Sequence, residues 1–277
     1  MSASQRQKYE LSIEQRRFFF TNGYLCVKGL LSDEELAELD AYSNDAMHGR
    51  IDFDHVIAEG VEPRCEGNTP AEMEDKFFRL IHFHRHVELF ERYLLHPRVL
   101  DVLEQLIGPD VSGLQSMMFF KPPGQYGQAY HQDSYYIKVK PDTVCGTWIA
   151  IDGCDEDNGC MYFVPGSHME PIYQDVHKPD NKDDFKENLT EIDNVDESRE
   201  VPAIANAGDV VFFHGRIIHR SKQNRTKDRY RRAFVCHYAN ARSYTQWHGG
   251  NAEHVLARGE THLPYATPKF VGQDATA

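Results

Sequence analysis

The sequence has few cysteines, and their spacing excludes the sites that paired cysteines usually form. None of the six lies in a Cys-x-x-Cys pair, which argues against a structural zinc site. The first ten residues, MSASQRQKYE, carry no secretory signal. We therefore expect reduced thiols in an intracellular, cytoplasmic protein.

Long apolar runs and basic residues are also scarce. No apolar run is long enough to span a bilayer, so we expect no membrane partner. The 30 Lys and Arg against 43 Asp and Glu give a net charge of −13, which disfavours a nucleic-acid partner because phosphates require a basic face. The last three residues, Ala-Thr-Ala, are not a peroxisomal address. A small molecule is the expected partner, and a homodimer is compatible with these features.

The first 110 of the 277 residues are predicted to form a mostly helical N-terminal layer. The segments at 12–15 and 32–35 both fit the capping box that starts a helix. Apolar residues recur at helical spacing over 87–107 and are interrupted at His96-Pro97, which predicts two helices. The acidic, irregular residues 50–75 are predicted to form a loop.

From about residue 111 to 245 the sequence changes to short, apolar, β-rich segments separated by turn residues. Such evenly spaced strands are typical of an antiparallel jelly roll or barrel. We predict a single domain, 1–277, that is mainly β with α additions, with a cupin-like double-stranded β-helix covered by the N-terminal helices. Residues 174–200 form an acid-rich insertion, either a solvated loop or a lid that closes over substrate, and 246–277 a C-terminal extension.

Two metal-ligand side chains, His131 and Asp133, lie two residues apart in GQAYHQDSYYIKV. Along a strand, residues i and i+2 point to the same face, so these side chains are predicted to project together. His219, in GDVVFFHGRIIHRSKQN, supplies a second imidazole. Two imidazoles and one carboxylate are the facial triad of non-heme Fe(II) oxygenases, which leaves coordination positions open.

Other histidines offer weaker alternatives. His214 also precedes a turn, but RIIH resumes an apolar strand, so His219 is preferred and His214 is predicted to be a structural neighbour. His82, His84 and His86 alternate at a strand-to-helix transition without a carboxylate at matching spacing. We predict a polar face there, with a role at the mouth of the site as the alternative.

A basic cluster at 225–232 precedes the apolar strand AFVCHYA. The planar fork of an arginine holds a carboxylate in bidentate fashion, which lysine does not. An arginine about one strand beyond the distal histidine is what a dicarboxylate cosubstrate requires, so this cluster strengthens the metal-site hypothesis.

Five segments, in this order, resemble the phytanoyl-CoA dioxygenase family of Fe(II)/2-oxoglutarate-dependent oxygenases: LQSMMFFKPPG, YHQDSYYIKV, TWIAIDGCDEDNGCMYFVPGSH, GDVVFFHGRIIHRSKQN and YRRAFVCHYA. The resemblance covers roughly residues 10–245. It implies a β-helix core and a dioxygenase that uses Fe(II), 2-oxoglutarate and O2, with ascorbate as a supporting reductant. It also implies that His131, Asp133 and His219 are the catalytic iron ligands. Because halogenating relatives lack this carboxylate, Asp133 favours hydroxylation or desaturation.

The resemblance further implies a cosubstrate site. Arg231 matches the arginine that pairs with the far carboxylate of 2-oxoglutarate. The chain carries one residue more than expected before this position, so Arg229 and Arg232 stay open as substitutes. Three other residues match positions that support or line the same pocket: Ser221, Gln115 and Trp148.

The substrate is the least determined part of the hypothesis. Arg79, among apolar residues, and Lys121 could pair with an anionic group, and Tyr130 and Tyr135 offer aromatic faces to an amine. The strong negative charge and the absence of a concentrated basic patch argue against CoA. We therefore favour hydroxylation of a small soluble metabolite, for example a zwitterionic amine or an aminoethylphosphonate. The alternatives are an acyl-CoA or larger natural product, a cupin-type metalloenzyme without 2-oxoglutarate, and a non-catalytic jelly-roll binding protein.

Overall fold

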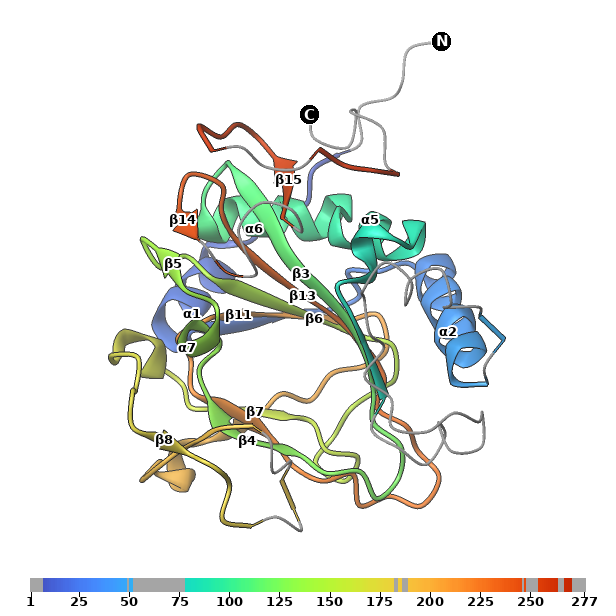
Figure 1. The fold of residues 1–277 in the computed structure, drawn as a ribbon, viewed down its shortest axis with the longest axis vertical. Helices are drawn as coiled ribbons and strands as arrows, with labels where there is room; N and C mark the ends of the chain where they lie inside the picture. Colours follow the sequence, from blue (N-terminus) through green and yellow to red (C-terminus); the bar gives the residue numbers. More distant parts are fainter. Residues whose placement is uncertain are drawn as a thin grey trace.

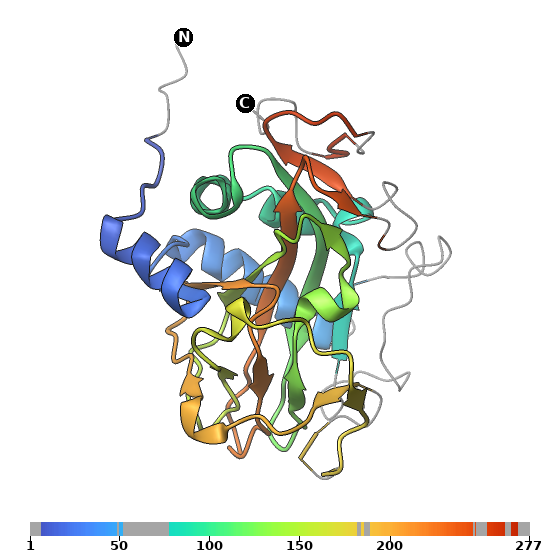
Figure 2. The same cartoon turned by 90° about the vertical axis from the view of Figure 1, so that its left-hand side faces the viewer.

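The computed structural model describes residues 7–48, 50–51, 78–181, 184–185, 189–245, 247, 254–263 and 267–270. Two antiparallel sheets face each other, and helices cover the outer face of the larger sheet (Figures 1 and 2). The predicted double-stranded β-helix is therefore confirmed. Most of the predicted loop at 50–75 lies outside the described residues.

The larger sheet is seven-stranded, and six of its strands form one continuous path. Its order is β1 (Tyr24–Val27), β11 (Val210–His214), β6 (Cys145–Ala150), β13 (Ala233–Asn240), β3 (Val111–Phe120) and β15 (Val255–Arg258), with β2 (Phe78–Ile81) also paired to β3. The N-terminal layer and the C-terminal extension therefore both add strands to the core sheet, along different halves of β3.

The smaller sheet is four-stranded and carries much of the site. Its order is β10 (Val201–Pro202), β7 (Met161–Phe163), β12 (His219–Ser221) and β4 (Gln128–His131). Two short pairs accompany it, β14 (Tyr244–Thr245) with β5 (Val139–Lys140) and β8 (Val176–His177) with β9 (Glu191–Ile192). Single turns of 3-10 helix lie at η1 (Phe83–Arg85), η2 (Ser167–Met169) and η3 (Glu197–Arg199).

Helices begin where the sequence predicts them. Ser12 caps α1 (Ile13–Asn22) and Ser32 caps α2 (Asp33–Met47), each in a capping box with the side chain three residues later. Gly23 ends α1 with a φ of 85°, a left-handed conformation that glycine adopts without strain. The two helices predicted over 87–107 are α5 (Glu88–Leu94) and α6 (Pro97–Ile107). No described helix is both long and apolar enough to cross a membrane.

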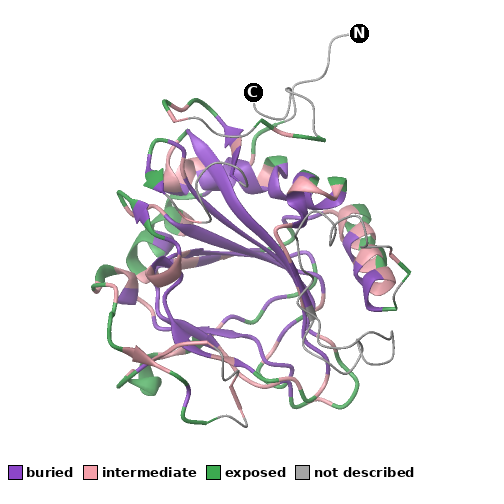
Figure 3. Ribbon diagram, in the orientation of Figure 1, coloured by how far each residue is buried: buried purple, intermediate pink, exposed green. Residues whose placement is uncertain are grey.

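The strands of the larger sheet are buried on both faces (Figure 3). Because side chains alternate along a strand, adjacent residues enter different cores. Phe212, Phe234 and Met118 pack in the core beneath the helices. The residues beside them enter the core between the sheets: Phe213, Val235 and Met117. This second core leaves room for a cavity.

Candidate active site

The chain turns sharply between the first two predicted ligands. β4 ends at His131, and Asp133 is the first residue of the short helix α7 (Asp133–Tyr136), so the prediction that both lie on one strand face is wrong. The buried side chain of Gln132 holds the turn. Its amide donates to the Arg216 carbonyl at 2.8 Å and accepts from the backbone N–H of Tyr173 at 2.9 Å. The turn directs Asp133 back toward His131.

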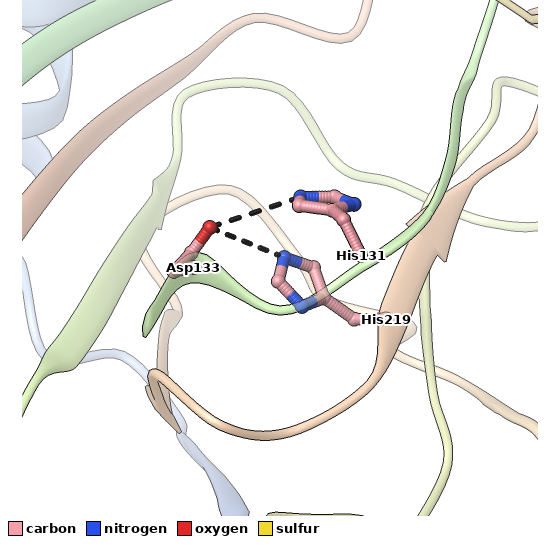
Figure 4. A group of neighbouring side chains, drawn as sticks. All are labelled: His131, Asp133 and His219. Atoms are coloured by element: carbon pink, nitrogen blue, oxygen red, sulfur yellow. Dashed lines mark ion pairs between the residues drawn. The ribbon is translucent and has the colours of Figure 1, made fainter. Parts of the chain in front are cut away.

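His219 comes from the neighbouring strand. It is the first residue of β12 and lies directly opposite His131 in the β12–β4 ladder. Their imidazole rings are 4.1 Å apart between centroids. Figure 4 shows the two rings and the Asp133 carboxylate pointing toward one another.

Main-chain hydrogen bonds fix which ring nitrogen of each histidine faces the carboxylate. His131 Nδ1 donates to the Ala129 carbonyl at 2.8 Å, and His219 Nδ1 to the Ile217 carbonyl at 3.0 Å. The two Nε2 atoms are then left unprotonated and lie 3.7 and 3.9 Å from Asp133 Oδ1. This tautomer is the one that binds a metal through Nε2.

Electrostatics keep His131 and Asp133 in their metal-binding forms. Burial, followed by the electrostatic effect of the neighbouring His219, lowers the pKa of His131 to about 3. Burial raises the pKa of Asp133, but His237 and His219 outweigh it, and the net pKa falls below its ordinary value. At neutral pH the site therefore offers a neutral imidazole and an ionised carboxylate.

His237, on β13, is a functional residue that the sequence reasoning missed. Its Nε2 donates to Asp133 Oδ2 at 2.9 Å, which leaves Oδ1 facing His131 and His219. The sequence AFVCHYA contained the signal, because Val235 and His237 are two residues apart and therefore lie on the same face of the strand. A hydrogen bond of this kind orients a metal-binding carboxylate.

The triad lies on the wall of a cavity of about 650 Å³ between the two sheets. Four Lys and Arg residues share this cavity with the ligands: Arg79, Lys121, Arg220 and Arg231. Aromatic side chains complete much of the wall: Phe119, Tyr126, Tyr136, Trp148, Phe213 and Trp247. All four are buried, with Lys121 only 1% exposed, and the guanidinium of Arg220 pairs with Glu200.

The arginines of the basic cluster point in different directions. Arg231 lines the cavity, with its guanidinium 5.5 Å from the centre of the Trp148 ring. Arg229 is exposed and pairs with Asp155 at 2.6 Å. Arg232 points to the opposite face of the sheet, where Asp152 binds it at 2.6 Å. Among the three alternatives, the structure brings only Arg231 into the cavity.

Lys121 and Ser221 surround the same end of the cavity. The Arg231 backbone N–H donates to the Lys121 carbonyl at 3.0 Å, and Lys121 Nζ donates to the Ser221 hydroxyl at 3.3 Å. Burial, followed by the charge of Arg231, holds the pKa of Lys121 well below its ordinary value. The cavity wall also contains Gln115 and Trp148, as the resemblance implied.

Two predicted substrate residues are not among those that line the cavity. Tyr130 precedes His131 on β4 and therefore points to the outer face, where its hydroxyl donates to Glu200 at 2.5 Å. The Lys138 ammonium lies 4.8 Å from the centre of the Tyr135 ring. The next residue, Tyr136, lines the cavity instead. Arg79, a third predicted substrate residue, lines the cavity and lies opposite Phe119 in the β2–β3 ladder.

The alternative histidines take other positions. His214 is not part of the triad, and its ring packs 5.5 Å from that of His168. His84 is buried and hydrogen-bonds to the Ser116 hydroxyl at 2.9 Å. His82 follows β2 and lines the cavity, 5.6 Å from Trp247 between ring centres. The three alternating histidines therefore do not form one polar face.

Two segments outside the β core also reach the cavity. Leu189, from the 174–200 insertion, contributes to the wall, and the neighbouring Thr190 hydrogen-bonds to the Tyr136 hydroxyl. Trp247 comes from the C-terminal extension. No spacing rule pointed to either residue, because their positions depend on where segments distant in the sequence reach the cavity.

The donor set fits Fe(II). His131, Asp133 and His219 each offer one ligand atom, and these atoms lie within 4.8 Å of one another in a buried site. Two imidazole nitrogens and one carboxylate oxygen, with open space on the cavity side, suit a metal that must also bind cosubstrate and oxygen. A double-stranded β-helix with this centre defines the class of non-heme iron oxygenases.

Comparisons with known proteins identify the family. A family model described as phytanoyl-CoA dioxygenase (PhyH) matches residues 19–233. The peroxisomal phytanoyl-CoA dioxygenase of Rattus norvegicus is 28% identical over 253 residues, covering 83% of this chain and 69% of the relative. The probable phytanoyl-CoA dioxygenase of Caenorhabditis elegans is 30% identical over 239 residues, covering 83% and 76%.

A solved structure supports the same fold. The epimerase SnoN, in complex with Fe3+, alpha ketoglutarate and nogalamycin RO, has a TM-score of 0.61 and 20% identity, covering 94% of this chain and 95% of its own. The chain belongs to the phytanoyl-CoA dioxygenase family of Fe(II)/2-oxoglutarate-dependent oxygenases.

Proposed function

We propose that this protein hydroxylates an unactivated C–H bond of a small soluble metabolite that carries an anionic group. The supporting observation is the shared cavity of about 650 Å³, in which the triad lies together with the buried basic side chains of Arg79, Lys121 and Arg231. Pockets of roughly 300–1,000 Å³ hold small molecules. The cavity therefore suits 2-oxoglutarate together with a small substrate.

Arg231 is proposed to hold the far carboxylate of 2-oxoglutarate. Its guanidinium is the fork-shaped donor in the part of the cavity that also contains Lys121 and Ser221. Trp148 supports its flat face. A buried arginine can bind a carboxylate in bidentate fashion, and the low local dielectric strengthens the interaction.

The chain's own residues position the reactants and protect them. When bound, Fe(II), 2-oxoglutarate and O2 supply the oxidising chemistry. His131 and His219 would bind the metal through Nε2 and Asp133 through Oδ1, as the hydrogen bonds of their other atoms require. Apolar walls, including Trp148 and other aromatic rings, exclude water from the site.

Arg79 is proposed to bind the anionic group of the substrate. It lies on β2, opposite Phe119 of β3, and Lys121 follows the end of β3. The aromatic faces of Tyr136 and Trp247 line the same cavity and could hold an ammonium group at about 0.5–2 kcal/mol per contact. A zwitterion such as an aminoethylphosphonate satisfies both kinds of group.

An acyl-CoA is the second candidate, because the curated relatives carry the name phytanoyl-CoA dioxygenase. Cosubstrate and substrate would share about 650 Å³, so most of a CoA moiety would lie outside the cavity. The chain's net charge of −13 makes that surrounding surface unfavourable for the CoA phosphates. We therefore favour the small metabolite.

An anaerobic titration of Fe(II) into protein with 2-oxoglutarate tests the centre. The wild type should develop a metal-to-cosubstrate charge-transfer band that is weak in Asp133→Ala and in Arg231→Gln. Arg229→Gln, an exposed arginine outside the cavity, is the matched control and should retain the band. If the folded, metal-loaded wild type gave no band, a non-catalytic binding protein or a cupin-type metalloenzyme without 2-oxoglutarate would be favoured.

Succinate release then tests the substrate. Small aminophosphonates and amino acids should stimulate it, and Arg79→Gln should raise the KM for the substrate with little effect on the KM for 2-oxoglutarate. Turnover of long-chain acyl-CoAs, without turnover of any small zwitterion, would overturn the substrate proposal and leave the centre intact.

A further inference from the structure

Gln128, the first residue of β4, makes an unexpected contact with a metal ligand. Its side-chain Nε2 lies 2.9 Å from His131 Nε2. Because His131 Nδ1 donates to the Ala129 carbonyl, Nε2 carries the lone pair and accepts this hydrogen bond. The Gln128 amide therefore donates to the same nitrogen that would bind the metal.

A single lone pair cannot serve both partners. Metal binding at His131 Nε2 must break the Gln128 hydrogen bond, and the amide then has to find another acceptor. The second histidine ligand differs in this respect. Among the described contacts, the nearest partner of His219 Nε2 is Asp133 Oδ1 at 3.9 Å.

The backbone limits where the released amide can turn. Gln128 lies opposite Ser221 in the β4–β12 ladder, and its backbone N–H donates to the Ser221 hydroxyl at 3.2 Å. The same hydroxyl accepts from Lys121 Nζ. Gln128 thus connects the metal ligands to the end of the cavity that holds Lys121 and Arg231, and its side chain lines the space between them.

We infer that Gln128 is a positioning residue with two partners. In the metal-free protein it covers the ligand nitrogen of His131. In the loaded enzyme it donates to the end of 2-oxoglutarate that lies nearest the metal. The second half rests on the proposed function, whereas the first half depends only on metal binding.

Metal titration without cosubstrate tests the first half. Gln128→Leu removes the donor and keeps a similar volume, and Gln128→Asn keeps an amide that is too short to reach His131. Both variants should bind Fe(II) or Co(II) roughly 2- to 10-fold more tightly than the wild type, the effect of losing one competing hydrogen bond. Gln223→Leu is the matched control, since that amide donates to the Gly124 carbonyl away from the cavity. Affinities equal to wild type in both Gln128 variants would overturn this half.

Cosubstrate binding to the metal-loaded variants tests the second half. Gln128→Leu should weaken 2-oxoglutarate binding several-fold and shift the maximum of the charge-transfer band, which a purely structural role would not do. Wild-type affinity and an unshifted band would overturn this half. If the wild type itself gave no band, the proposed function would fail, while the metal titrations would still decide whether Gln128 covers His131.

Discussion

Arg231 and Arg232 are neighbours in the sequence, yet they belong to opposite faces of the larger sheet. Arg231 lines the cavity over Trp148. Arg232 turns toward the helices, where it binds Asp152 at 2.6 Å and Asp40 at 2.7 Å. The period of two along a strand, rather than residue type, therefore separates residues of the site from residues that stabilise the fold.

The smaller sheet repeats this division. On the inner side of β12, His219 faces Asp133. On the outer side, Arg220 pairs with Glu200 at 2.8 Å, and its guanidinium lies 4.3 Å from the centre of the Tyr130 ring. Inner-face variants should therefore lose ligand binding and remain folded. Outer-face variants should lose stability and retain the site.

The largest effect is expected for Asp133→Ala on the inner face. Removing the only carboxylate of the triad should weaken Fe(II) binding by more than about 100-fold, because even partners of metal ligands contribute 10- to 100-fold. An anaerobic titration with Fe(II) or Co(II) measures this, with urea unfolding of the metal-free protein beside it. Asp152→Asn, an outer-face carboxylate, should keep metal affinity and lose stability. Loss of metal binding in both variants would contradict the division of roles between the two faces of the sheet.

Arg231→Gln and Arg232→Gln test the two faces directly. Arg231→Gln should weaken 2-oxoglutarate binding roughly 10- to 100-fold, since charge-assisted hydrogen bonds contribute about 1.5–3 kcal/mol. Arg232→Gln should lower the free energy of unfolding by roughly 2–4 kcal/mol, because Asp152 and Asp40 would lose their partner. Binding titrations and urea unfolding of both variants separate the effects. Equal losses of both kinds in both variants would show that the faces are not independent.

His237→Ala should have a smaller effect on the centre. Without the donor to Oδ2, Asp133 can rotate, and metal affinity should fall by about 10-fold. His237→Gln retains a donor and should restore part of the loss. Cys236→Ala, the adjacent residue in the core beneath the helices, should leave metal affinity unchanged and cost stability only. If His237→Ala bound metal as tightly as wild type, its role at the centre would be excluded.

The sequence predicted the metal end of the cavity better than the substrate end. The triad residues and Arg231 lie in motifs that are recognised by their order in the chain. The resemblance therefore pointed to residues that share one cavity, even though the strand predicted at Asp133 is a short helix. Side chains alternate between the two faces of β4, so His131 faces the cavity and Tyr130 faces the outer side. The same alternation along β13 would have pointed to His237.

The substrate end depends on how separate segments cross the cavity. Leu189 and Trp247 reach the wall from the insertion and the C-terminal extension, and His82 does so with a left-handed backbone, φ 63°. Local patterns contain no information about such crossings, because these residues have no partner at a fixed sequence distance. Closure of the 174–200 insertion over substrate stays a prediction, which protection of this segment from proteolysis by substrate would test.

The smallest effect concerns pH and the outer face of the smaller sheet. Burial raises the pKa of Glu200, but hydrogen bonds from Arg220, Lys222 and Tyr130 outweigh it, and the net pKa falls below its ordinary value of 4.5. A carboxylate with a lowered folded-state pKa adds stability above its unfolded pKa, and this contribution disappears as the pH falls through the folded value. Glu200→Gln should therefore be about 1 kcal/mol less stable than wild type at pH 7, and the difference should shrink below about pH 4.5.

Urea unfolding of both proteins between pH 7 and pH 3 measures this difference. Metal affinity at pH 7 serves as the control and should be equal in the two proteins, because Glu200 contacts Tyr130 and Arg220 on the side of the sheet away from the triad. A difference in stability that stayed constant with pH would mean that the packing of Glu200, not its charge, holds the 197–200 segment on the sheet. A change in metal affinity would mean that the outer face of β12 helps to set the position of His219, and the division between the two faces would then hold only for the larger sheet.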